Sequence, residues 1–448
     1  MRLHIRRILL GFSYTAFVII APLIILYAIG YRPQISSPIP RAVGVVLADA
    51  TPGRATVSVN GTAYGTLPRA VPNIDPGLTL VEIAKEGYST WKKSLEVKST
   101  QATDVRSVRL LPSSFESEVI ANNARMFAAS PTNLLIAITD KDNVLSVRDT
   151  DGTIVPPTHP LLRQPTKISW SPDGTYILVS FPKNSYELFH INRAQLEKVP
   201  SKLLNNSTNI IWSPIAPNTL YGLTTTGDII SHDISKGANE TIAQNVTTYE
   251  ISNRTIYYQT FENELISQSL RSQDPRTIIQ DTGKSIKKIS AGNNNTLALL
   301  FIDGELTLYT GEGYGTTISP SVLHMSWSPD GQLLLLQTAP TELHVYNVGN
   351  ERLFAIPQGE LRLITRLSQP ITFPEWFSDS QHITFQANDT IVFSEIDTRD
   401  HAIATPIDTT STRLPIAIGE GSKSILYIKE NGSASRLVQT WLLTPADR

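Results

Sequence analysis

The sequence of 448 residues contains no cysteine. Disulfide bonds, zinc sites built from thiolates and cysteine nucleophiles are therefore all excluded. This absence is compatible with the outside of a cell whose exported proteins avoid thiols. The charges nearly balance, with 38 basic residues, 40 acidic residues and a formal net charge of −2. That balance gives no electrostatic case for nucleic acid as a partner.

Catalytic and metal-binding motifs are also missing. The eight histidines are scattered, and the sequence has no His-Glu-x-x-His and no Gly-x-Ser-x-Gly motif. Ser89 and Lys92 match Ser-x-x-Lys by letters, but on an alternating strand residues three apart face opposite sides. We therefore expect no catalytic residue, no metal ligand and no cofactor.

The N-terminus carries a long apolar segment. Residues 8–29 include no charged side chain. About 20 such residues in a helix cross the hydrocarbon core of a membrane. Arg2, Arg6 and Arg7 precede the segment, so the positive-inside rule places the N-terminus in the cytoplasm and the bulk of the chain outside the cell membrane. Residues 1–30 are thus predicted to be a cytoplasmic tip and a single-pass transmembrane anchor.

A cleaved signal peptide is the alternative, with Ala28-Ile29-Gly30 as the cleavage site. The apolar part of a signal peptide usually spans roughly 7–15 residues, and the longer segment here favours the anchor. Residues 31–42 follow as a spacer, because Pro33, Pro38 and Pro40 favour an extended and semi-rigid chain.

Residues 43–112 show the pattern of a small β-sandwich, with short alternating strands between turns. Asn60-Gly61 directly follows one such strand and is the strongest short hairpin signal. The order of Pro52-Gly-Arg-Ala55, Asn60-Gly61, Lys85-Glu-Gly-Tyr88 and Trp91 resembles a PEGA domain over residues 43–111, although the family's Pro-Glu-Gly-Ala is here Pro-Gly-Arg-Ala. The resemblance implies an extracytoplasmic stalk or adhesion module without catalysis.

One hairpin motif recurs in residues 113–448. Trp170-Ser-Pro-Asp-Gly174 returns as Trp327-Ser-Pro-Asp-Gly331, and shorter versions begin at Trp212 and Trp376. Each lies between two short apolar strands, and Pro-Asp-Gly favours a tight turn. A hairpin that returns about every 40 residues is typical of the four-stranded blades of a β-propeller.

The hairpins predict eight blades, or seven if the weak fourth or eighth unit is not a blade. The last unit ends one strand short. Residues 115–121 precede the first unit and have no blade of their own, so we expect them to supply that strand and close the ring.

The repeats resemble those of TolB-like propellers, also called WD-like periplasmic propellers. In that family the tryptophan packs between blades and Asp-Gly forms the hairpin turn. The resemblance implies these structural roles for Trp170, Asp173, Gly174, Trp212, Trp327, Asp330, Gly331 and Trp376. An aromatic binding stripe made of the tryptophans is the alternative. Such repeats specify a fold and not a reaction.

The sequence therefore predicts an all-β protein behind one transmembrane helix, with a PEGA-like sandwich followed by a propeller. We expect a non-enzymatic surface protein whose propeller binds a protein or glycan of the cell envelope. A lyase or hydrolase with its site in the central channel is the alternative, and it requires acids, histidines or a metal from several blades to converge. A periplasmic assembly factor is suggested by the TolB resemblance alone.

Overall fold

The computed structural model describes residues 2–28, 31–34, 37–132, 134–192, 195–199, 207–272, 274–293, 295–311, 315–349, 356–411, 414–431 and 434–448. Residues 29 and 30 of the predicted cleavage site lie outside the described residues. The chain divides into two compact units. Unit 1 comprises Met1–Phe115, Arg399–His401 and Leu443–Arg448, and unit 2 comprises Glu116–Thr398 and Ala402–Leu442.

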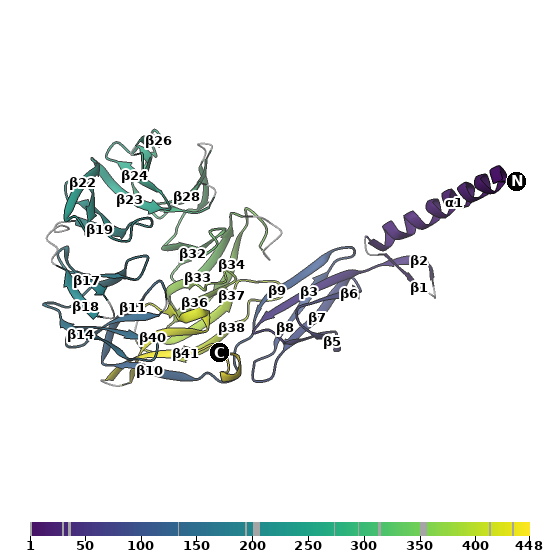
Figure 1. Ribbon diagram of the computed structural model, residues 1–448, viewed down its shortest axis with the longest axis horizontal. Helices are drawn as coiled ribbons and strands as arrows, with labels where there is room; N and C mark the ends of the chain where they lie inside the picture. The colour runs from purple at the N-terminus through teal and green to yellow at the C-terminus, as the bar shows by residue number, and fades with distance from the viewer. Residues whose placement is uncertain are drawn as a thin grey trace. The chain divides into compact units, whose positions relative to one another are not determined.

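The N-terminal segment of unit 1 forms the helix α1 (Arg2–Ala28), drawn in purple in Figure 1. Leu9–Leu26 has a mean hydropathy of 2.3 and none of it is buried. Apolar side chains such as Phe12, which is 74% exposed, therefore have no protein core to enter. Among the described residues, α1 is the one helix with the length and composition to cross a membrane.

The proline-rich segment after α1 forms a two-stranded hairpin where the sequence predicts a single extended spacer. β1 (Tyr31–Gln34) pairs with β2 (Ser37–Ala42) in antiparallel register. Both strands are edges of this small sheet, and edge strands tolerate proline because some of their N–H groups need no partner. The extended backbone that proline favours is thus kept, but the chain folds back on itself.

Residues 44–109 build a sandwich of two sheets. The first sheet has the order β6 (Arg69–Ile74), β3 (Gly44–Thr51), β9 (Ala102–Arg109), and the second has the order β5 (Thr62–Thr66), β4 (Thr56–Val59), β7 (Gly77–Ala84), β8 (Trp91–Val97). Asn60 and Gly61 join β4 to β5 with φ of 48° and 78°, as a tight hairpin requires. The buried face of β8 alternates strictly, with Trp91 and Leu95 inside. The predicted sandwich and its Asn-Gly hairpin are confirmed.

The described residues of unit 2 pair into eight four-stranded sheets. In chain order the first seven are β11 (Ala124–Ala129) to β14 (Ile154–Pro160), β15 (Lys167–Trp170) to β18 (Gln195–Val199), β19 (Ser207–Trp212) to β22 (Ala238–Ala243), β23 (Val246–Ser252) to β26 (Pro275–Ile279), β27 (Ile286–Ala291) to β30 (Gly315–Ser319), β31 (His324–Trp327) to β34 (Leu361–Arg366), and β35 (Ile371–Trp376) to β38 (Ala404–Thr409). Figure 1 shows them passing from blue through teal to green. In each of the seven, consecutive strands are neighbours and antiparallel.

The eighth sheet joins the two ends of the unit. β39 (Ala417–Ile418), β40 (Ser424–Asn431) and β41 (Ala434–Trp441) are completed by β10 (Ser117–Asn122), which pairs antiparallel with β41. The sequence predicts this closing strand at residues 115–121, and the structure confirms it with a small shift of its bounds. Because β10 covers the outer edge of β41, that edge is not left open to another chain. A ring of eight blades stays a prediction.

Neighbouring sheets bury apolar side chains between their faces. Leu145 and Val147 of β13 (Val144–Asp149) lie in one cluster with Ile168 and Phe189 of the following sheet. Each fully buried side chain of this kind contributes about 1.5–3 kcal/mol. The core of unit 2 is therefore distributed over the surfaces between sheets, which is the arrangement that a repeat of four-stranded units requires.

Candidate functional site

The tryptophans of the repeated hairpins lie at the ends of first strands and reach the preceding sheet. Trp170 Nε1 donates a hydrogen bond of 2.9 Å to the carbonyl oxygen of Ala128. The equivalent bond from Trp376 Nε1 to the carbonyl of Ser326 is 3.0 Å long. Trp170 is 7% exposed and Trp376 is 6% exposed, so neither offers a ring face to a ligand.

Trp327 and Trp212, the other two predicted tryptophans, differ from Trp170 and Trp376 in their burial or in their hydrogen bonding. Trp327 Nε1 donates to the carbonyl of Ser290 at 3.3 Å, and its side chain is half-buried. Trp212 Nε1 is buried and has no hydrogen-bond partner among the described residues. Trp212 instead stacks on Tyr176 of the preceding sheet, with ring centroids 6.2 Å apart. We infer that all four tryptophans serve the contact between sheets, and three of them do so through a hydrogen bond as well.

The Asp-Gly turns of the two full motifs have the geometry that the residue types favour. Ser171 Oγ donates to Asp173 Oδ1 at 2.6 Å, and the backbone N–H of Thr175 donates to the same oxygen at 3.1 Å. Gly174 has φ of 74°, in the region where a side chain is strained. Burial alone would raise the pKa of Asp173, but these hydrogen bonds outweigh it and lower the pKa.

The second full motif repeats this turn. Ser328 Oγ donates to Asp330 Oδ1 at 2.6 Å, and Gly331 has φ of 66°. The hydrogen bonds of both aspartate carboxylates stay within the turn, and the backbone N–H of Asp330 also donates to Ser380 Oγ at 3.1 Å. We therefore infer a structural role for Asp173, Gly174, Asp330 and Gly331.

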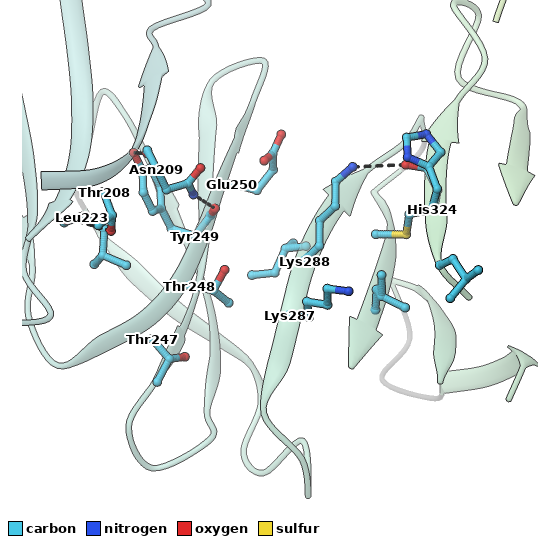
Figure 2. A pocket seen from close by; sticks show the side chains of 14 residues that line it. Thr208, Asn209, Leu223, Thr247, Thr248, Tyr249, Glu250, Lys287, Lys288 and His324 are labelled. Atoms are coloured by element: carbon cyan, nitrogen blue, oxygen red, sulfur yellow. Dashed lines mark hydrogen bonds between the residues drawn. The ribbon is translucent and has the colours of Figure 1, made fainter. Parts of the chain in front are cut away.

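A cavity of about 450 Å³ lies between the first strands of four successive sheets. Figure 2 shows its polar lining, with Glu250 on β23, Lys288 on β27 and His324 on β31. The lining residues are Thr208, Asn209, Leu223, Thr247, Thr248, Tyr249, Glu250, Lys287, Lys288, Ile289, Leu300, Leu323, His324 and Met325. None of them belongs to a repeated hairpin motif. A cavity of this size can hold a small organic molecule.

One wall of the cavity is held by a reciprocal pair between β19 and β23. Tyr249 Oη donates to the carbonyl oxygen of Asn209 at 2.6 Å, and Asn209 Nδ2 donates to the carbonyl oxygen of Tyr249 at 3.3 Å. Burial raises the pKa of Tyr249 well above its ordinary value, so the phenol stays a donor. The pair fixes the backbone of β23 directly before Glu250.

Lys288 is the charged centre of the site. Its Nζ donates to the carbonyl oxygen of Met325 at 3.1 Å, which carries the ammonium from β27 toward β31, as Figure 2 shows. Burial raises the pKa of Glu250 to about 7, although the Lys288 ammonium opposes the shift. Burial, and to a lesser extent Lys288, lowers the pKa of His324. At neutral pH the site therefore holds a partly protonated glutamate and a neutral histidine beside Lys288.

A second glutamate, Glu375 on β35, also feels the charge of Lys288. Burial raises its pKa, and the ammonium again opposes the shift. The side chain of Glu375 is exposed to solvent. The raised pKa and the solvent exposure of Glu375 are compatible, because a carboxyl that touches water is still poorly solvated when protein atoms surround it on most sides.

Sequence reasoning missed this site because no motif marks it, but the repeat itself contains a signal. In the two full motifs the residue before the tryptophan is serine, Ser169 and Ser326. Glu375 takes this place before Trp376, and Glu250 takes the equivalent place in β23. A charged residue where other repeats have a small one is a recognisable exception.

The described residues contain no group of three or more His, Asp or Glu side chains arranged to hold a metal ion. Within the same part of the chain, no hydrogen bond joins Glu250, Lys288 and His324 to one another. The site can thus offer an ammonium, a carboxyl and a hydroxyl to a ligand.

One family model matches part of unit 1, and solved structures resemble most of the chain in fold. Residues 43–110 match the PEGA domain. No curated protein matches the chain in sequence.

Three solved structures resemble the chain. The C-terminal WD40 domain of Sif2 has a TM-score of 0.53 and 12% identity, covering 72% of this chain and 98% of that one. The computationally designed Ika8 protein has a TM-score of 0.51 and 12% identity, and the match covers 74% of this chain and 98% of that one. Sqt1 of Saccharomyces cerevisiae has a TM-score of 0.52 and 10% identity, and the match covers 72% of this chain and 97% of that one. At these identities the likeness concerns the fold alone, and the chain thus combines an N-terminal apolar helix, a PEGA domain match at residues 43–110 and a β-propeller like that of WD40 proteins.

Proposed function

We propose that the chain is a membrane-tethered binding protein of the cell envelope, with its N-terminus in the cytoplasm and its PEGA domain and propeller outside. The observation that carries this proposal is the order of the parts. An apolar helix comes first, a PEGA domain match follows at residues 43–110, and a propeller occupies most of the remainder.

Two features support the orientation. Arg2, Arg6 and Arg7 lie before the apolar segment, and cytoplasmic flanks carry such an excess of basic residues. The apolar window of α1 spans Leu9–Leu26, which is long for the apolar part of a signal peptide and sufficient for a membrane crossing. We therefore propose an uncleaved single-pass anchor.

The propeller supports a binding role on physical grounds. Its rigid sheets carry loops at both ends of the strands, and loops on a rigid scaffold commonly form binding surfaces. The repeated hairpins are used for packing, which leaves the loops and the cavity as the surfaces open to a partner. We propose a protein or a glycan of the envelope as that partner.

The absence of cysteine allows a direct test of topology. Single cysteines replace His4, exposed Ser99 in unit 1 or exposed Ser272 in unit 2, and intact cells are treated with a membrane-impermeant maleimide. We expect labelling of Ser99→Cys and Ser272→Cys, and labelling of His4→Cys only after lysis. Labelling of Ser272→Cys only after lysis would overturn the proposal.

The same samples distinguish an anchor from a cleaved signal peptide. An uncleaved chain keeps the cysteine of His4→Cys in the membrane fraction, while cleavage removes it. Affinity capture from envelope extract with the detergent-solubilised full chain, compared with a chain lacking residues 43–110, then asks whether a specific partner binds the propeller. Failure to retain any specific protein or glycan would contradict the binding role.

An enzyme is the second candidate, and one observation favours it. The pKa of Glu250, raised to about 7 by burial, suits a general acid or base at neutral pH. Envelope glycan incubated with the purified chain would then show cleavage that Glu250→Gln abolishes. Intact glycan under these conditions leaves the binding role as the better account.

A further inference from the structure

The cavity between β19, β23, β27 and β31 is richer in positive than in negative charge. Lys287 and Lys288 contribute two ammonium groups, and among the described residues Glu250 is the one carboxyl in its lining. His324 also lines the cavity, and its lowered pKa keeps it neutral at pH 7. No charged side chain of β19 lines the cavity. A bound anion would therefore balance the excess positive charge of the cavity lining.

Lys288 is placed to hold such an anion. Its ammonium has three N–H donors, and the structure assigns one of them to the carbonyl oxygen of Met325. Among the described residues it forms no salt bridge, and the interactions with Glu250 and Glu375 act over a longer range. An ammonium that lines a cavity and keeps further N–H donors can bind carboxylate or phosphate oxygens through charge-assisted hydrogen bonds.

The neutral lining fits the same kind of ligand. Thr248 brings a hydroxyl group to the cavity, as Figure 2 shows, whereas the hydroxyls of Thr208 and Thr247 already donate to the carbonyl oxygens of Leu223 and Gln259. Leu223, Ile289 and Leu300 supply an apolar part. A volume of about 450 Å³ exceeds that of a bare inorganic ion and suits a small organic molecule.

We propose that this cavity binds a small organic anion that carries a carboxylate or a phosphate group, with Lys288 as its anchoring cation. This site is additional to the envelope partner proposed above and does not depend on membrane topology. A protein or glycan on the loops and a small anion in the cavity are separate ligands.

Glu250 sets the pH dependence of this site. When ionised it repels an anion held by Lys288, and when protonated it can donate a hydrogen bond to one. A bound anion raises the pKa of a neighbouring carboxyl further, so binding takes up a proton. The other ionisable groups near Glu250 are Tyr249, Tyr257 opposite it on β24, Lys287, Lys288, His324 and the more distant Glu375. The affinity for an anion should therefore rise as the pH falls from 8 to 6.

Isothermal titration calorimetry of the full chain in detergent micelles tests the proposal. The probes are succinate and glycerol phosphate, with succinamide and glycerol as neutral counterparts. We expect one or both anions to bind at pH 6 and the neutral molecules not to bind. The comparison of succinate with glycerol phosphate shows which acidic group the site prefers. Titration in two buffers of different ionisation enthalpy should report proton uptake.

Two variants make the test specific. Lys288→Met should weaken anion binding by about tenfold or more, because it removes a charge-assisted hydrogen bond. Lys167→Met is the matched control, since Lys167 lies three residues before Trp170 on an exposed face outside the cavity lining. It should leave the affinity unchanged. Circular dichroism and melting temperature establish that both variants are folded.

Glu250→Gln supplies an independent measurement. It should bind the anion at pH 8 as tightly as the native chain does at pH 6, without proton uptake. Absence of anion binding by the native chain, binding that Lys288→Met leaves intact, or preferential binding of a cationic probe such as agmatine would each overturn the proposal. Failure of anion binding would not affect the proposed membrane topology, because topology is tested by cysteine labelling in cells.

Discussion

The indole nitrogen of Trp170 lies 2.9 Å from the carbonyl oxygen of Ala128, and this hydrogen bond joins the first strands of two consecutive sheets. The acceptor lies one residue before the end of β11, at the place that serine occupies before the tryptophan in the full motifs. The motif that forms a local turn thus also contributes a bond between sheets.

Trp170→Phe should destabilise unit 2 more than Trp212→Phe does. The first change leaves the Ala128 carbonyl without its donor, at a cost of about 1–2 kcal/mol. The second removes an indole N–H that has no partner among the described residues, so only the lost volume counts. Thermal melting of the two variants beside the native chain measures the difference. Equal losses would contradict a stabilising role for the bond.

Much of this fold could be predicted because its determinants are local. The Asn60-Gly61 hairpin and the Pro-Asp-Gly turns depend on residues that favour positive φ, and the structure has positive φ at Asn60, Gly61, Gly174 and Gly331. The period of the hairpins predicted the succession of four-stranded sheets. The unfinished last unit predicted that β10 completes the sheet of β41, which the strand pairing confirms.

The cavity could not be predicted in the same way. Glu250, Lys288 and His324 come from three sheets, and their approach depends on how the sheets pack. The raised pKa of Glu250 results from burial, which no single strand reveals. The hairpin of β1 and β2 also escaped prediction, because proline favours an extended backbone whether or not a second strand pairs with it.

Asp408→Asn should destabilise unit 2 at neutral pH by about 1–2 kcal/mol. Both carboxyl oxygens of Asp408 lie 2.7 Å from Lys429 Nζ, and this pair joins β38 to β40 of the next sheet. Burial alone would raise the pKa of Asp408, but hydrogen bonds from Lys429 and Tyr427 outweigh it and lower the pKa.

The sign of the pH effect follows from that lowered pKa. The stabilisation is present above the unfolded-state pKa of about 3.9 and is lost as the pH falls through the folded-state value. Melting temperatures of Asp408→Asn and the native chain should therefore converge in acid. Asp303→Asn, which removes an exposed partner of Lys284, is the control and should leave the melting temperature unchanged. A difference that persists unchanged below pH 3 would refute the ionic explanation.

Glu250→Gln should be more stable than the native chain at pH 8. Its folded-state pKa of about 7 lies above the unfolded-state value near 4.3, so the folded state holds the proton more tightly. The stability contributed by protonated Glu250 is complete below pH 4.3 and is lost as the pH rises toward 7. On the order of 3–4 kcal/mol should separate the two proteins at pH 8, because the two pKa values differ by about 2.7.

Denaturant unfolding between pH 5 and 8 measures this difference. The difference in unfolding free energy between Glu250→Gln and the native chain should grow with pH and level off above pH 7. Glu262→Gln, at an exposed position, should show no such growth. A constant difference at all pH values would mean that Glu250 does not titrate in this range.

A disulfide between Ser117→Cys and Thr440→Cys should form on oxidation and stabilise unit 2. Ser117 pairs with Thr440 across β10 and β41, and their side-chain oxygens are 2.7 Å apart. Thiols at these positions are close enough to join without a large movement of the backbone. No native cysteine competes for them.

The bond would close a loop that contains nearly all of unit 2, for which chain entropy predicts a gain of about 4 kcal/mol or more before strain is subtracted. Thiol titration and melting with and without reductant measure its formation and its effect. Ser117→Cys alone is the control and should show no dependence on reductant. If β10 did not complete the last sheet, the two thiols would stay reduced or would join different chains into dimers, and the melting temperature would not rise. A stabilised monomer is expected, because β10 and β41 are already hydrogen-bonded neighbours in the native chain.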